Sequence, residues 1–218
     1  MKYSAKLVAY TQPVIGIPVS GPEALVAYCA RVSNPSNQDN PDYKKLLEYC
    51  IRNKHWSVFE MVNAVVEVKA PRDITRQLLR HRSFSFQEFS QRYSDEIEFT
   101  DRDFRRQDNK NRQNSIDDLD EDVVNMSISQ MEALLDYVKD SYEAMRKGNV
   151  AKECARVILP EGLTMSTLYV NGTLRSFLTY LEVRDDPHVT QHEHVLLAQA
   201  IREALLPIFP TVLKKDNE

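Results

Sequence analysis

The chain has 218 residues, 42% hydrophobic content and a formal net charge of −4, which is enough for one sizeable core. This charge disfavours a nucleic-acid-binding protein, and we expect neither a membrane span, which needs about 20 apolar residues, nor a signal peptide. The odd number of cysteines (Cys29, Cys50 and Cys154), without C-x-x-C spacing, favours reduced thiols in the cytoplasm and argues against a zinc site.

Two helices and a strand are expected in the first third of the chain. The first helix begins at Gly21-Pro22-Glu23 and ends near Arg31, because proline is favoured in a first helical turn. The second runs from about residue 41 to residue 53 and carries an apolar stripe. Alternating apolar and polar residues over 62–69 predict a strand.

A cationic helix end is expected next. Ala70-Pro71 ends the strand, and Asp73 is placed to cap a helix over residues 73–82. This helix would bring Gln77, Arg80 and His81 together at its C-terminal end. The helix dipole favours cations there, by roughly 0.3–1 kcal/mol each.

Residues 80–93, here called the Arg–Phe strip, mix arginines and one carboxylate with hydroxyls and phenyl rings. From Ser83 onward the pattern alternates, with Ser83 and Ser85 on one side and Phe84 and Phe86 on the other. A guanidinium group can donate two parallel hydrogen bonds to two phosphate oxygens, and hydroxyl groups can form hydrogen bonds with a base or a ribose. The strip therefore predicts one wall of a site for a flat, anionic ligand.

The second half of the chain predicts a long polar excursion and several helices. The excursion covers about residues 98–120, and loops of this length are functional or mobile. A long helix is expected over 121–147, with Gly148 at its end and a buried stripe of Met131, Leu134, Leu135, Val138 and Tyr142. Asn149 would cap a short helix ending before Pro160, followed by a strand over 163–170, a helix over 172–183 and a last helix from 187–188 to 206. These elements predict a single α+β domain spanning 1–218, with an antiparallel sheet flanked by long helices.

The Arg–Phe strip also resembles a known family signature. Arg80, His81, Arg82, Ser85, Ser90 and Arg92 fit R-H-R-x-x-S-x-x-x-x-S-x-R, the motif of the flavin-dependent thymidylate synthases. Four further stretches resemble family segments: 30–33, 55–60 (H-x-[ST]-x-F-E), 155–160 (A-R-x-x-L-P) and the pair 173–175 and 184–188. The chain departs from the family pattern at Met61, Gln87, Thr173 and Thr179.

The resemblance implies a reaction and its cofactors. The implied enzyme methylates deoxyuridine monophosphate (dUMP) to thymidine monophosphate (dTMP), with 5,10-methylenetetrahydrofolate as carbon donor. FAD, recharged by NADPH, would supply the hydride, and no enzyme cysteine would attack the uracil. The resemblance further implies a homotetramer with active sites at subunit interfaces, and no nucleic-acid or membrane partner.

The resemblance also assigns residues to ligands. Arg184 and Ser90 are the expected catalytic residues, with Arg184 beside the uracil, where it would favour the ring-deprotonated form. The nucleotide would be held by Gln77, Arg80, Glu88, Ser90, Gln91, Arg92, Arg156 and Arg184. The flavin would be bound by Ser33, His55, Ser57, Arg80, His81, Arg82, Glu88, Thr173, Arg175, Thr179 and His188. Folate and nicotinamide would stack near His188.

Several of these residues have a plainer interpretation. Ser33 would only cap the first helix, Glu60 would pair with Lys54, and Arg156 would share a solvated face with Lys152. Arg175 and Arg184 lie nine positions apart, so they do not share one helical face and suit different ligands or subunits.

Two chemical alternatives are weaker. His188 and His192 have metalloprotease-like spacing, but the H-E-x-x-H order is absent, so no metal site is expected. Cys154 would be a nucleophile only with a nearby base, and none is close in sequence, so a buried, inert thiol is expected.

Two other functions remain open at this stage. An RNA- or nucleotide-binding module would stack bases on the Arg–Phe strip and would be colourless. A nicotinamide-dependent flavin reductase would be yellow but indifferent to dUMP.

Overall fold

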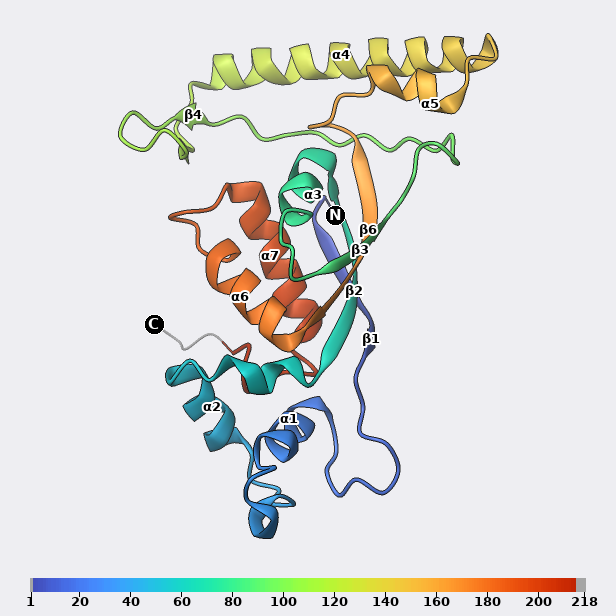
Figure 1. Ribbon diagram of the computed structural model, residues 1–218. Helices are drawn as coiled ribbons and strands as arrows, with labels where there is room; N and C mark the ends of the chain where they lie inside the picture. The colour runs from blue at the N-terminus through green and yellow to red at the C-terminus, as the bar shows by residue number, and fades with distance from the viewer. Residues whose placement is uncertain (1, 215–218) are drawn as a thin grey trace.

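The computed structural model describes residues 2–214, and its centre is an antiparallel sheet in the strand order β1-β2-β6-β3 (Figure 1). β1 spans Ser4–Tyr10, β2 Asn63–Pro71, β6 Met165–Thr173 and β3 Ser85–Glu88. β2 pairs with β1 on one side and with β6 on the other. Every second residue of β2 from Ala64 to Ala70 is buried, as expected for a strand with one face in the core.

Helices from the C-terminal part of the chain cover this sheet. α6 (Leu174–Arg184) packs against α7 (His192–Leu205), and α7 packs against β1 and β2. α1 (Pro22–Ala30), α2 (Lys44–Arg52) and the short turns η1 (Pro35–Asn37) and η2 (Trp56–Glu60) lie at the lower end of Figure 1. The core includes the fully buried rings of Phe59, Phe177, Tyr180 and Phe209.

Close packing explains the glycine at position 172. A Cβ added to Gly172 would lie 2.3 Å from Cδ1 of Phe84. The Phe84 ring packs against Phe177 and Tyr180, with centroid separations of 4.9 and 5.8 Å, so it has little room to retreat. Gly172 thus lets the start of β3 lie close to β6, which fixes the Arg–Phe strip on the sheet.

The helix expected over 121–147 is confirmed as α4 (Glu121–Lys147), and its N-cap Asp120 accepts a hydrogen bond from the Asp122 backbone nitrogen. α4 stands apart from the sheet, alongside α5 (Lys152–Ala155), at the top of Figure 1. Of its predicted stripe, Met131, Val138 and Tyr142 are buried, whereas Leu134 is 47% exposed. Large apolar side chains of α4 therefore face solvent in the single chain: Val123, Met126, Leu134 and Tyr137.

The excursion at 98–120 is attached to the segment that precedes β6 of the central sheet. It contains a two-stranded antiparallel pair, β4 (Arg106–Gln107) and β5 (Ser115–Ile116). An isolated bridge between Phe99 and Thr164 ties its start to the segment before β6.

Three expected caps and starts are wrong. α3 (Arg72–Leu78) begins after Pro71, and the Asp73 carboxylate pairs with Arg102 instead of capping it. Asn149 has a left-handed φ of 62°, and α5 begins after Ala151 before passing into η3 (Arg156–Ile158). The last helix starts at His192 rather than at 187–188, because the Asp186 carboxylate accepts from the His188 backbone nitrogen and forms a turn there.

Other elements are confirmed with shifted limits. The strands expected at 62–69 and 163–170 are β2 and β6, and β6 continues through Gly172 and Thr173, which were expected to open the next helix. The alternation after Ser83 is confirmed as β3, with Phe84 7% exposed and Ser85 outward. β1 is a strand that was not predicted from the sequence. None of its residues is buried, so it lacks the clear alternation of buried and exposed positions seen in β2.

Candidate functional site

One group of predicted residues meets where the turn after α3, the end of α6 and the start of α7 come together. Arg184 Nε donates to His81 Nε2 over 3.1 Å, and the His81 ring stands edge-on to Tyr180 at 5.0 Å. Tyr180 Oη lies 3.1 Å from His194 Nε2, and His194 Nδ1 lies 3.2 Å from Gln77 Oε1. Gln77, His81 and Arg184 are thus linked through two residues that the sequence did not indicate.

The two histidines of this group are neutral. Burial, the Arg184 guanidinium and the Arg80 guanidinium all lower the pKa of His81. Burial, with Arg184 and His81 nearby, lowers the pKa of His194 to about 3. A neutral His81 has a free ring nitrogen to accept the Arg184 N–H, so Arg184 is oriented without losing its charge.

A second group of predicted residues surrounds the end of β3 and the start of η3. Glu88 accepts a hydrogen bond from Ser166 Oγ at 2.9 Å and lies 3.7 Å from an Arg72 guanidinium nitrogen. Gln91 is buried and, with Arg156, lines a cavity of about 380 Å³. Three guanidinium groups border this cavity, those of Arg72, Arg76 and Arg156.

The strip residues beside this cavity are more open. The Ser90 hydroxyl accepts from the Arg92 backbone nitrogen at 3.3 Å, and the Arg92 guanidinium lies 3.3 Å from Glu153. Lys152 pairs with Asp95 at 3.0 Å and does not line the cavity with Arg156. Lys152 and Arg156 are both half-buried, and their side chains have different neighbours.

A third group lies around the start of α6. Arg175 forms an ion pair with Glu60, so the alternative pairing of Glu60 with Lys54 is wrong. Thr173 Oγ1 accepts from the Ser176 backbone nitrogen and caps α6, and Thr179 donates to the Arg175 carbonyl at 2.8 Å. His55 stands edge-on to Tyr49 at 5.6 Å.

The remaining predicted residues are exposed, as is His55: Ser33, Ser57, Arg80, Arg82 and His188. α1 ends with Arg31 as its C-cap, two residues before Ser33, and so the capping role considered for Ser33 is not observed. Within residues 2–214, no hydrogen bond or ion pair joins the side chains of the third group to those of the first two. One chain thus presents its predicted residues as separate groups.

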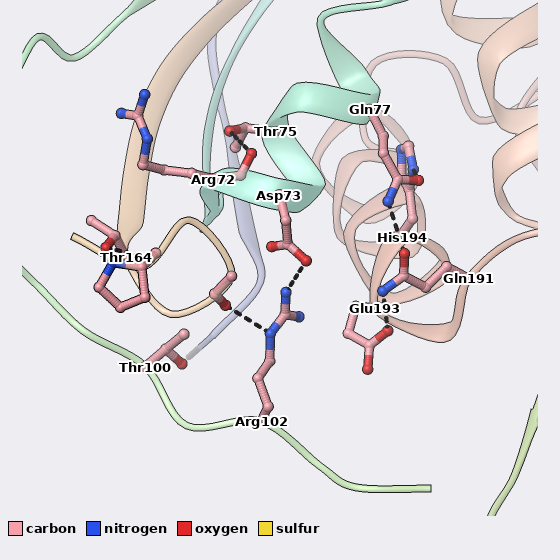
Figure 2. Close-up of polar contacts among 12 residues, drawn as sticks. Arg72, Asp73, Thr75, Gln77, Thr100, Arg102, Thr164, Gln191, Glu193 and His194 are labelled. Carbon is pink, nitrogen blue, oxygen red and sulfur yellow. Dashed lines mark hydrogen bonds and ion pairs between the residues drawn. The ribbon is translucent and has the colours of Figure 1, made fainter. Parts of the chain in front are cut away.

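Sequence reasoning missed two arginines of the excursion, Arg102 and Arg105, which anchor it to the site, and Figure 2 shows Arg102. Arg102 binds the Asp73 carboxylate, the Gly162 carbonyl at 2.9 Å and the Tyr3 hydroxyl at 2.8 Å. Arg105 binds Glu193 at the start of α7. Nothing local distinguishes these two cations from the solvated charges around them, because their partners are distant in sequence.

Two chemical alternatives can be compared with the geometry. His194 is fully buried between Tyr180 and Gln77, and within the described residues no three His, Cys, Asp or Glu side chains are grouped to hold a metal. Cys154 is exposed, so the expectation of a buried thiol is wrong. No described helix is both long and apolar enough to cross a membrane.

Comparisons with known proteins agree on one family. The profile described as thymidylate synthase complementing protein matches residues 6–211. The chain is 49% identical over 210 residues to a flavin-dependent thymidylate synthase of Synechocystis sp., covering 95% of this chain and 96% of the relative. It is 46% identical over 213 residues to a probable flavin-dependent thymidylate synthase of Paramecium bursaria Chlorella virus 1, covering 97% of each. Its fold resembles a UMP/dUMP methylase, PolB, from Streptomyces cacaoi bound with 5-Br dUMP, with a TM-score of 0.79 and 23% identity over 97% of this chain and 93% of the other.

Proposed function

The chain belongs to the family described as thymidylate synthase complementing protein, as a flavin-dependent thymidylate synthase, and we propose that it methylates dUMP with 5,10-methylenetetrahydrofolate and NADPH. The observation that carries the proposal is the Arg184–His81 contact, which joins the expected uracil residue to the Arg80-His81-Arg82 triplet.

The second group supports the phosphate end of the nucleotide. The cavity is lined by Arg72, Arg76 and Arg156 together with Glu153 and Glu161, so its arginines outnumber its carboxylates and offer hydrogen-bond donors to a phosphate monoester. Arg76 Nε forms an ion pair with Glu161 Oε1 at 3.0 Å, whereas Arg156 makes no ion pair within the described residues. Arg156 is thus the arginine most available to the phosphate. Ser90 and Arg92 lie beyond the end of β3, on either side of Gln91, which lines the cavity.

The first group supports activation of the uracil. Arg184 uses Nε on His81, which leaves its two terminal nitrogens to face a ligand. A guanidinium beside the uracil favours the anionic form of the ring, which is electrostatic activation without a covalent enzyme adduct. The one-carbon unit of the folate would bond to ring carbon C5, the proton on C5 would leave, and the bond between that one-carbon unit and the folate nitrogen would break. Hydride from the reduced flavin would then complete the methyl group.

The flavin fits the exposed donors of the triplet and of the third group. Arg82, His55 and Ser57 are exposed, and Arg175 keeps donors besides those used on Glu60. Cations and neutral donors of this kind suit the phosphates and the ring carbonyls of FAD. A bound flavin supplies hydride equivalents and regains them from a reduced nicotinamide.

We further propose a homotetramer with sites shared between subunits. Two observations support it: the predicted residues of one chain lie in separate groups, and α4 exposes Met126, Leu134 and Tyr137. Apolar patches of this kind are typical of subunit interfaces. α7 offers less apolar surface to such an interface, because its Val195, Leu197 and Ile201 are buried in the chain's own core.

We also place the enzyme in the cytoplasm, which suits its odd number of cysteines. For the RNA-binding alternative, Phe84 offers no face for stacking because it is buried against other rings, and the exposed rings of the strip are Phe89 and Tyr93.

An absorbance spectrum of the purified protein tests the proposal. The protein should be yellow with bound flavin, and adding dUMP should change the rate at which the reduced flavin is oxidised. A colourless protein would favour a nucleic-acid binder, and oxidation indifferent to dUMP would favour a flavin reductase.

A further inference from the structure

A continuous row of hydrogen bonds connects Arg105 of the 98–120 excursion to Gln77, and Figure 2 shows its part from Glu193 through Gln191 to Gln77. Arg105 donates to one carboxylate oxygen of Glu193, and Gln191 Nε2 donates to the other at 2.9 Å. Gln77 Nε2 donates to Gln191 Oε1 at 2.8 Å, and Gln77 Oε1 faces His194 Nδ1 at 3.2 Å. Every member of this row except Gln77 lies outside the site residues assigned above.

The carboxylate of Glu193 sets the direction of the whole row. Burial raises the pKa of Glu193, but the hydrogen bonds from Arg105, its own backbone and Gln191 outweigh burial, so the pKa lies below its usual range. An ionised carboxylate only accepts hydrogen bonds, so Gln191 must turn its NH₂ group toward Glu193. The Gln191 carbonyl then faces Gln77, and Gln77 must turn its own NH₂ group toward that carbonyl.

The same logic fixes the proton on His194. With its NH₂ group toward Gln191, Gln77 presents its carbonyl to the imidazole, so Nδ1 of His194 must carry the hydrogen. Nε2 is then the acceptor, and the Tyr180 hydroxyl, 3.1 Å away, must be the donor. Reversing the Gln191 amide would turn its oxygen toward the Glu193 carboxylate, and reversing the Gln77 amide would turn its oxygen toward that of Gln191. Leaving a polar group unsatisfied is most costly at the part-buried contacts with Glu193 and His194.

We propose that Glu193 and His194 are positioning residues that lock the side-chain amide of Gln77, so that its remaining N–H is a fixed donor for an acceptor atom of the nucleotide. The inference rests on the proposed nucleotide role of Gln77. The inference also assigns a role to the 98–120 excursion. Its Arg105 binds the Glu193 carboxylate, which determines the donor and acceptor orientation of every hydrogen bond in the row. The side-chain amide of an unconstrained glutamine rotates readily and can present either its NH₂ group or its oxygen to a ligand, whereas the amide of Gln77 presents an N–H donor.

Binding of dUMP to the flavin-loaded protein, measured by calorimetry, tests the inference with a pair of similar-sized replacements. His194→Asn keeps an N–H near the position of Nδ1, whereas His194→Leu removes it. We expect dUMP to bind about 5- to 10-fold more weakly to His194→Leu, the effect of about one hydrogen bond, and the Asn variant to recover most of this loss. His192→Asn and His192→Leu are matched controls, since His192 is exposed on the same helix, and both should bind as the wild type does.

A second measurement does not depend on nucleotide binding or on the variants' folding. Nitrogen-15 NMR of the wild-type protein should show His194 neutral, with the hydrogen on Nδ1. A hydrogen on Nε2, or a charged imidazolium near pH 7, would overturn the inference. Equal dUMP affinity for His194→Leu and wild type would also overturn it and leave the proposed function intact, whereas a wild-type protein that does not bind dUMP would defeat both.

Discussion

Arg184 and His81 are 103 residues apart in the chain, yet Nε of the guanidinium donates to Nε2 of the imidazole over 3.1 Å. The contact needs a neutral imidazole, which burial and the neighbouring guanidinium groups provide by lowering the pKa of His81. It ties the end of α6 to the triplet in the Arg–Phe strip, and so places the expected uracil and flavin residues side by side.

Removing the Arg184 guanidinium should therefore remove most of the catalysis. Arg184→Ala should lower the methylation rate about 100- to 1000-fold, the usual effect of losing one preorganised electrostatic partner. Arg184→Lys should lose much of the rate as well, because an ammonium cannot reproduce the planar fork. Tritium release from labelled dUMP measures both, with exposed Arg52→Ala in α2 as the control. Near-normal turnover in Arg184→Ala would contradict this role.

The triplet should matter for flavin retention. Arg82→Ala and His81→Ala should each lower flavin occupancy and activity together, while circular dichroism shows an intact fold. Arg82 is exposed, so its removal leaves no cavity in the core. The ratio of flavin absorbance to protein absorbance measures occupancy, and normal flavin content in both variants would count against the assignment.

The buried His194 should make the protein less stable in mild acid. Its pKa lies at about 3 in the folded protein and near 6.5 when unfolded, so between these values only the unfolded chain takes up the proton. Stability from this residue is thus present above pH 6.5 and is lost as the pH falls, by up to about 1.4 kcal/mol per pH unit. Urea unfolding between pH 6.5 and 4.5 should show a shallower dependence for His194→Asn than for the wild type, and equal slopes would contradict the shift.

The exposed face of α4 should be an interface in solution. Light scattering should give a mass of about four times the 25.2 kDa chain. Leu134→Glu, which places a charge on the exposed apolar stripe, should shift the mass toward smaller species. A wild-type monomer that still binds flavin stoichiometrically would contradict shared sites.

Some of this structure follows from local sequence and some does not. α4 is predicted closely because its apolar period and Gly148 are local signals, and Asp120, which caps its start, is local as well. The Arg–Phe strip is likewise recognisable from its own residues. The roles of Asp73, Arg105 and His194 are not, because each is decided by a partner at least 29 positions away. Cys154 shows the same limit, since its exposure depends on how α5 lies beside α4.

The most direct test of the account is dTMP formation by a flavin-loaded variant without any cysteine. Cys154 is exposed, Cys29 half-buried and Cys50 buried at 4% exposure, so Cys29→Ala/Cys50→Ala/Cys154→Ala should fold with a modest loss of stability. With dUMP, 5,10-methylenetetrahydrofolate and NADPH, this variant should keep most of the wild-type rate and lose it when the flavin is removed. A folded, flavin-loaded variant that forms no dTMP would show that a cysteine attacks the uracil and would contradict the account.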